Sequence, residues 1–83
     1  MTDSKSQSVS YEVEFLFQQG LRLVDKKDYE AALVCFDQAV KSKPDYQEAW
    51  CQKGLALGYL GRHEEALNSF DNALAIQPNT SWV

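Results

Sequence analysis

The chain has little of what several classes of protein depend on. Among its 83 residues it has 2 cysteines, 1 histidine and 2 prolines, and its formal net charge is −4. Cys35 and Cys51 have no CxxC spacing and do not build the dense disulfide framework of a small secreted domain, so a reducing, cytoplasmic location is expected. Together with His63 they also fall short of the about four ligands of a structural zinc site. We therefore expect no metal ion or other cofactor.

Charge and hydropathy argue against two further classes. The acidic balance disfavours a nucleic-acid partner, because phosphates call for a basic face. No unbroken apolar run approaches the about 20 residues needed to cross a bilayer, so no membrane insertion is expected. The first ten residues, MTDSKSQSVS, contain no apolar stretch that could act as a signal peptide. Residues 1–10 are predicted to be a flexible polar tail.

What the chain does have is one pattern that occurs twice, 34 residues apart and without a gap. A period of 20–50 residues is typical of stacked supersecondary units, which usually serve as binding surfaces. The recurring positions are Gly20, Leu21, Leu23, Glu30, Ala32, Leu33, Phe36, Asp37, Ala39 and Pro44, which reappear as Gly54, Leu55, Leu57, Glu64, Ala66, Leu67, Phe70, Asp71, Ala73 and Pro78.

Hydrophobic spacing predicts four helices. The expected ranges are residue 11 to about 26, 29 to about 42, 46 to about 60, and about 63 to 76. Asp28 is the expected N-cap of the second helix, and Asp45 with Glu48 is an acidic capping box for the third. Pro44 ends the second helix and Pro78 the fourth, because proline cannot continue a helix.

The two units differ in the turns between their helices. Gly61 can close the third helix in the left-handed conformation at no steric cost. Lys27 stands at the equivalent place in the first unit, so that turn either strains Lys27, at a cost on the order of 1 kcal/mol, or adopts another geometry. Arg62 replaces Asp28, so the fourth helix loses its N-cap. The second unit therefore has the better turn and the first has the better cap.

Small and large residues alternate on the helix faces that should meet. Gly20 with Ala32, and Gly54 with Ala66, would let the two helices of each unit approach closely. Large side chains, Leu16 and Phe36 in the first unit and Trp50 and Phe70 in the second, would fill the space around each contact. The expected buried stripes are Ala32, Leu33, Phe36, Ala39 and Val40 on the second helix, and Ala66, Leu67, Phe70, Ala73 and Leu74 on the fourth.

This pattern resembles the tetratricopeptide repeat: a bulky aromatic residue, then Gly, Ala, Phe or Tyr, Ala and Pro at fixed spacing. Trp50, Gly54, Gly61, Ala66, Phe70, Ala73 and Pro78 match the family motif, and the first unit departs from it at Leu16 and Lys27. The resemblance implies an all-α fold, in which antiparallel helix-turn-helix pairs stack as a short right-handed α-solenoid of four helices. It divides residues 11–80 into repeats 13–46 and 47–80, followed by a stub, residues 81–83.

The resemblance also implies a binding surface, because the first helix of each pair lines a concave groove in this family. The corresponding positions are Phe17, Gln18, Leu21, Val24, Cys51, Gln52, Leu55 and Tyr59. Independently, Phe17, Leu21 and Val24 share a helical spacing off the stripe that packs within the pair. A well-known groove of the family holds acidic C-terminal peptides through a carboxylate clamp, but Phe17, Leu21 and Gln52 occupy the matching places here. An amphipathic helix or hydrophobic segment is the expected ligand.

These observations favour a non-enzymatic protein-protein interaction module. No phosphate-binding loop, catalytic triad or metal motif is present, and His63 and Cys51 have simple packing interpretations. The alternatives are a structural self-assembly unit, which stacks through uncapped repeat faces, and a fragment of a longer array. The apolar strip could equally be covered by the chain's own neighbours, and Trp82 could fold back as a partial cap. The sequence does not name the partner.

Overall fold

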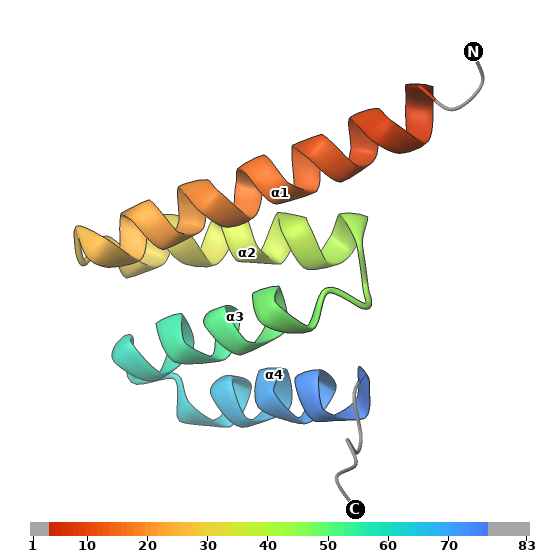
Figure 1. Cartoon of the computed structure of the whole chain (residues 1–83). Helices are drawn as coiled ribbons and strands as arrows, with labels where there is room; N and C mark the ends of the chain where they lie inside the picture. Colours follow the sequence, from red (N-terminus) through yellow and green to blue (C-terminus); the bar gives the residue numbers. More distant parts are fainter. Residues whose placement is uncertain (1–3, 77–83) are drawn as a thin grey trace, which may run out of the picture.

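The computed structural model describes residues 4–76, and the side chains of residues 11–76. This part of the chain forms α1 (Ser4–Asp25), α2 (Tyr29–Ser42), α3 (Gln47–Tyr59) and α4 (His63–Ile76), without strands. The helices lie side by side in chain order, and each runs opposite to the one before it (Figure 1). Neighbouring helices pack against each other, and α1 also touches α3. The predicted all-α solenoid of stacked helix pairs is confirmed.

The ends of α2 and α4 agree with the predictions, whereas two helix starts do not. α1 begins at Ser4 rather than Tyr11. The segment between them contains neither proline nor glycine, and a polar sequence excludes burial rather than helix formation. α3 begins at Gln47, with Tyr46 rather than Asp45 in the N-cap position. The Tyr46 N–H donates to the Lys43 carbonyl at 3.0 Å, and this turn leaves Asp45 outside the helix.

The remaining end signals have mixed outcomes. Asp28 does occupy the N-cap position of α2, but its side chain makes no capping hydrogen bond. Pro44 follows the end of α2 as expected. Pro78, Trp82 and the stub, residues 81–83, lie outside the described residues. The division of the chain into tail, repeat domain and stub stays a prediction.

The turns within the two helix pairs have the same backbone geometry. Lys27 has φ 66° and Gly61 has φ 82°, so both are left-handed. In the first turn the Asp28 N–H donates to the Leu23 carbonyl at 2.8 Å, and in the second the Arg62 N–H donates to the Leu57 carbonyl at 2.9 Å. This is the bond that closes a helix around a left-handed residue. Of the two geometries that the sequence left open for the first turn, the structure has the one that places Lys27 in the left-handed region.

The closest approach within each pair lies at a glycine. The Phe36 ring covers Gly20, and the Phe70 ring covers Gly54, where a Cβ atom would lie only 2.7 Å from the ring's Cε1 atom. Real side chains do not approach so closely, so only glycine fits. Each of the two phenylalanines thus packs on the glycine of its own pair.

The core joins the first three helices. Val13 of α1, Ala39 and Val40 of α2 and Ala49 of α3 form a buried cluster, and Leu16, Phe17, Tyr46 and Trp50 pack around it. The predicted stripe of α2 is buried at Ala32, Phe36, Ala39 and Val40.

The predicted stripe of α4 is partly wrong. Ala66 and Ala73 are buried, but Leu67 is 63% exposed and Leu74 is 64% exposed. Both leucines lie on the side of α4 that no further helix covers among residues 4–76. Helical spacing identified the apolar side correctly but could not supply the helix that would bury it.

Candidate functional site

The predicted groove residues come from α1 and α3, the first helix of each pair. Gln18 of α1 is exposed, and Leu21 and Val24 are half-buried. On α3, Cys51 and Gln52 are half-buried, whereas Leu55 is 46% exposed and Tyr59 is 64% exposed. The accessible apolar surface at these positions therefore lies mainly on α3, at Leu55 and Tyr59.

Phe17 packs into the fold. Its ring lies 5.8 Å from the Phe36 ring and 5.1 Å from the Tyr46 ring, measured between centroids, and it is half-buried. Because Tyr46 comes from the connection between α2 and α3, the spacing along α1 gave no sign of this contact. Phe17 supports the base of the surface and offers little area to a ligand.

Tyr46 was missing from the predicted site, although it shapes this end of the molecule. Burial raises the pKa of its phenol, and the nearby carboxylates of Glu48 and Glu14 raise it further. The Lys43 ammonium lies 5.1 Å from the centre of the Tyr46 ring, which is within the range of a cation–π contact. The available signal was an aromatic residue at a repeat position where the second unit has Thr80.

Tyr59 also makes a contact that the sequence did not reveal. Its ring stacks on the Tyr29 ring, with centroids 4.5 Å apart and planes inclined by 14°. The first residue of α2 therefore lies against the last residue of α3. Offset-stacked rings stabilise by about 0.5–1.5 kcal/mol beyond the area they bury. The stack joins the two repeats at their turn ends and holds Tyr59 in place.

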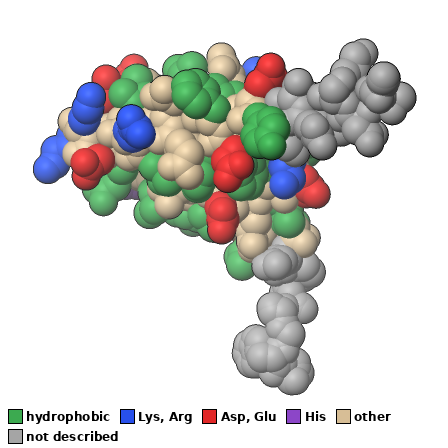
Figure 2. Space-filling view, turned by 45° about the horizontal axis from the view of Figure 1, so that its top comes forward, with side chains coloured by type: hydrophobic (Ala, Val, Ile, Leu, Met, Phe, Trp, Pro, Cys, Tyr) green, Lys and Arg blue, Asp and Glu red, His purple; other side chains and the backbone are tan. Residues whose placement is uncertain are grey.

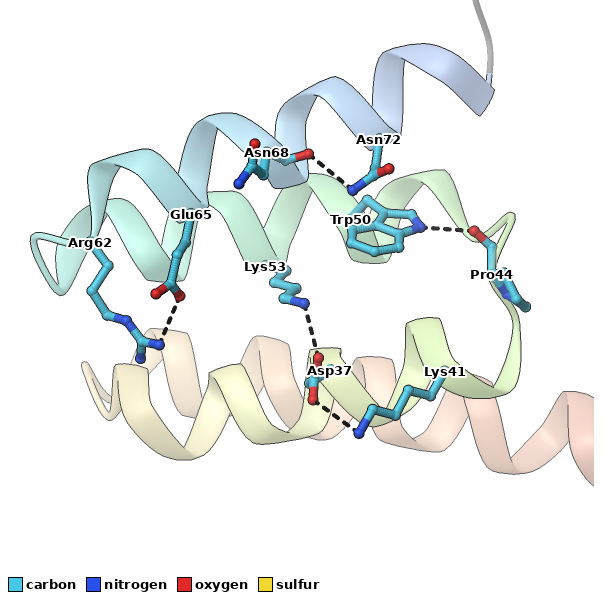
Figure 3. Close-up of polar contacts among 9 residues, drawn as sticks. All are labelled: Asp37, Lys41, Pro44, Trp50, Lys53, Arg62, Glu65, Asn68 and Asn72. Atoms are coloured by element: carbon cyan, nitrogen blue, oxygen red, sulfur yellow. Dashed lines mark hydrogen bonds and ion pairs between the residues drawn. The ribbon is translucent and has the colours of Figure 1, made fainter.

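A charged cluster connects α2 with α3 (Figure 3). The Lys53 ammonium lies 2.9 Å from an Asp37 carboxylate oxygen, and Lys41 reaches the other oxygen at 3.7 Å. The hydrogen bond from Lys53 is the main reason that the pKa of the Asp37 carboxyl is lowered. Lys53 also lies 5.0 Å from the centre of the Trp50 ring, whose Nε1 donates to the Pro44 carbonyl at 2.8 Å. These contacts fix the junction between the repeats.

The described side chains offer no sign of reaction chemistry. Within residues 11–76, no three potential metal ligands come together. Burial raises the pKa of the Cys35 thiol, which is the opposite of what an activated thiolate requires. Among those residues every buried polar side-chain atom has a hydrogen-bond partner. None of the helices in the described part of the chain is long and apolar enough to cross a membrane.

Comparison with known protein families accounts for the repeat. Residues 48–80 match a model described as "Tetratricopeptide repeat", and residues 20–61 match one described as "TPR repeat". The chain belongs to the tetratricopeptide repeat (TPR) family. Together the two matched ranges span residues 20–80, from the end of α1 through α4, and they contain the positions that recur 34 residues apart.

The chain covers very different shares of the proteins that it resembles. The chain is 41% identical over 64 residues to an uncharacterized protein of Methanocaldococcus jannaschii (MJ0572), covering 77% of this chain and 74% of that protein. It is 30% identical over 60 residues to the peroxisomal targeting signal receptor of Saccharomyces cerevisiae, covering 72% of this chain but 10% of the receptor. It is 32% identical over 63 residues to the STIP1 homolog of Dictyostelium discoideum, covering 76% of this chain and 11% of that protein.

Proposed function

We propose that this TPR chain is a non-enzymatic protein-protein interaction module, and that its α1–α3 face binds an apolar or amphipathic helical segment of a partner protein. The observation that carries the proposal is the apolar surface of α3. Leu55 and Tyr59 lie one helical turn apart and remain 46% and 64% exposed. Apolar side chains at this spacing form the kind of surface that receives one face of a partner helix.

Neighbouring residues extend this surface in a way that suits an apolar ligand. Leu21 and Val24 on α1 are half-buried, so each keeps part of its side chain accessible. Phe17 is held between the Phe36 and Tyr46 rings and gives α1 a rigid base. A preformed apolar surface binds with less loss of conformational entropy than a flexible one.

The charges of the site argue against an acidic peptide as ligand. Lys53, the cation in the middle of α3, is already paired with Asp37 and lies over Trp50. Leu21 and Gln52 contribute no positive charge to the proposed surface. A carboxylate buried without a cation is costly, so the surface selects for apolar side chains.

The test is a selection of helical peptides from a displayed library, followed by calorimetry with the selected peptides. Leu55→Glu should weaken their binding by about tenfold or more, because a charge replaces an apolar contact. Val34→Glu is the matched control: Val34 is 57% exposed, but it lies on α2, away from the proposed surface. Equal binding by the Leu55→Glu variant, or selection of peptides with acidic tails, would contradict the proposal.

Self-assembly is a second candidate function, and the exposed Leu67 and Leu74 of α4 favour it. These leucines belong to the stripe that a neighbouring repeat covers in the first helix pair. This function uses the ends of the helix stack and leaves the α1–α3 face free. The two candidate functions are therefore separable by substitutions on different helices.

A further inference from the structure

We propose that copies of this chain associate head to tail. The outer side of α4, with Leu67, Asp71 and Leu74, would pack in one copy on the outer side of α1, with Tyr11, Phe15 and Leu16, in the next. The proposal rests on the second candidate function, self-assembly, and assigns its geometry. The α2–α3 junction inside the chain shows which contacts a junction between two chains would contain.

The α2–α3 junction contains three kinds of contact. Val40 of α2 is 4% exposed and shares a buried cluster with Ala49 of α3. Asp37 pairs with Lys53 across the junction. Tyr29 and Tyr59 stack where the start of α2 meets the end of α3. Apolar burial, a polar pair and an end-to-end contact thus define the pattern.

The outer side of α4 is one half of the same pattern. A shift of 34 residues takes Leu33, Asp37 and Val40 of α2 to Leu67, Asp71 and Leu74 of α4. Val40 is 4% exposed in its junction, whereas Leu74 is 64% exposed. Within residues 11–76 the Asp71 carboxylate has no salt-bridge partner. Among the described residues, α4 therefore presents the α2-like half of a junction without its counterpart.

The outer side of α1 is the other half. The same shift in reverse takes Ala49 and Trp50 of α3 to Phe15 and Leu16 of α1. Phe15 is 62% exposed and Tyr11, one turn earlier, is 71% exposed. With Glu12 and Leu16 they line an open, mainly apolar hollow of about 450 Å³. In Figure 2, where the α1 end of the stack is turned forward, hydrophobic side chains reach the surface among charged ones.

The antiparallel pattern sets which residues meet. Val40 and Ala49 belong to one buried cluster, and the Asp37–Lys53 pair sets the register of the two helices. In the same register, Leu74 would enter the hollow beside Phe15 of the next copy. Phe15 of α1 is larger than its counterpart Ala49, and Leu16 is smaller than its counterpart Trp50. On α1 the large and the small residue therefore stand in the opposite order to that on α3. The exchange leaves a hollow on α1 to receive Leu74.

Polar residues at the junction are also complementary. Asp71 would meet Gln19, the counterpart of Lys53, whose amide can donate a hydrogen bond to the carboxylate. His63 would lie near Asp25, as Tyr29 lies near Tyr59. The last turn of α1 carries both Arg22 and Asp25, and Arg22 could pair there with Glu64 in the first turn of α4.

Within one molecule, the outer side of α4 cannot pack on the outer side of α1. α1 and α4 lie at opposite ends of the row of helices (Figure 1). An interface between two different surfaces is heterologous, and it continues from copy to copy unless the rotation closes a ring. The proposal therefore predicts growth with concentration beyond a dimer.

The test is sedimentation equilibrium from micromolar to millimolar concentration, on the full chain and on two variants. Leu74→Glu removes the α4 half and Phe15→Glu removes the α1 half. Both positions are largely exposed, so both variants should keep the helical circular dichroism of the parent. Leu67→Glu and Tyr11→Glu serve in their place if either fails to fold, and Val34→Glu is the control that should associate like the parent.

The expected result is complementation. Each variant alone should self-associate at least about tenfold more weakly than the parent. An equal mixture of the two variants should form a one-to-one heterodimer, through the intact α4 of one variant and the intact α1 of the other. A parent that stays monomeric throughout overturns self-assembly itself. Dimerisation of Phe15→Glu alone, or association that neither variant weakens, overturns the head-to-tail geometry while keeping self-assembly. None of these outcomes bears on ligand binding at Leu55.

Discussion

The two helix pairs have the same repeat positions but different surroundings. α2 lies between α1 and α3, whereas α4 packs on α3 alone within the described residues. Phe36 is 0% exposed, while its counterpart Phe70 is half-buried. Asp37 has an ion pair and Asp71, among the side chains of residues 11–76, has none. The repeat therefore fixes which side of a helix is apolar, and the neighbouring helix decides whether that side is buried.

This difference has an energetic consequence. Stability in a stacked repeat is approximately a sum of terms within each unit and terms between neighbours. Contacts within a pair, such as those of the two glycines, should matter equally in both pairs. Contacts to the next unit should matter only in the first pair. Substitutions at matched positions can separate these two kinds of term.

The largest effect is expected from Gly54→Leu. The Phe70 ring leaves no room even for a Cβ atom at Gly54, so the longer side chain should unfold the domain by forcing α3 and α4 apart. Gly58→Ala is the control on the same helix: its Cβ would meet nothing within 4 Å, and alanine should stabilise by about 0.5–1 kcal/mol. Thermal melts by circular dichroism check both variants. A Gly54→Leu variant that melts like the parent would show the contact to be misassigned.

The second comparison is Phe36→Ala against Phe70→Ala. Removing a fully buried phenylalanine costs about 3–5 kcal/mol, so Phe36→Ala should leave the chain largely unfolded. Phe70 is only half-buried, so Phe70→Ala should lower the free energy of unfolding by clearly less than Phe36→Ala. Urea titrations at low protein concentration would measure both. Equal losses of stability would mean that the greater burial of Phe36, to which the Phe17 ring contributes, has no effect.

A smaller effect is expected at the two left-handed turn residues. Lys27→Gly should stabilise the chain by up to about 1 kcal/mol, because glycine adopts a positive φ without the steric cost that lysine pays. Gly61→Lys should destabilise by a similar amount. Since a Cβ at Gly61 meets nothing within 4 Å, only the backbone conformation is at stake. The two substitutions should change the free energy of unfolding, measured by urea denaturation, in opposite directions. A change in the same direction would refute the assignment of strain to Lys27.

The smallest effect is expected at the paired aspartates. Asp37→Asn should cost at most about 1 kcal/mol at neutral pH, because the Asp37 side chain is 40% exposed and solvent screens the pair. The pKa of Asp37 is lowered in the folded state, so this stability is present above the ordinary value of 3.8 and is lost as pH falls through the lowered pKa. Asp71→Asn should be neutral at pH 7, because the Asp71 carboxylate has no ion-pair partner within residues 11–76. Denaturation of both variants at pH 7 and pH 3 checks the difference.

The sequence predicted the features that depend on local spacing. The ranges of α2 and α4 and the left-handed Gly61 follow from the repeat. The sequence left two geometries open for the turn at Lys27, and the structure has the left-handed one. Helix starts were harder. α3 begins at Gln47 because the connection bonds Tyr46 to Lys43, which a capping-box pattern at Asp45 does not reveal.

The candidate site was only partly predictable, because its details depend on contacts between distant segments. Phe17 was expected in the groove, but the Tyr46 ring from the α2–α3 connection covers part of it. Tyr59 was expected to face a ligand, and its stack on Tyr29 could not be read from either helix alone. The role of Leu55 as groove residue stays a prediction, and the structure adds that nearly half of its side chain is accessible.

The proposed head-to-tail junction requires that the exposed apolar side of α4 packs on α1 of another copy. Methyl NMR spectra of the full chain, recorded at increasing concentration, test this most directly. We predict that the methyl signals of Leu67 and Leu74 shift or broaden, while those of Val34, which is 57% exposed, stay unchanged. Signals that are constant throughout, or a Val34 response equal to that of Leu74, would contradict the claim.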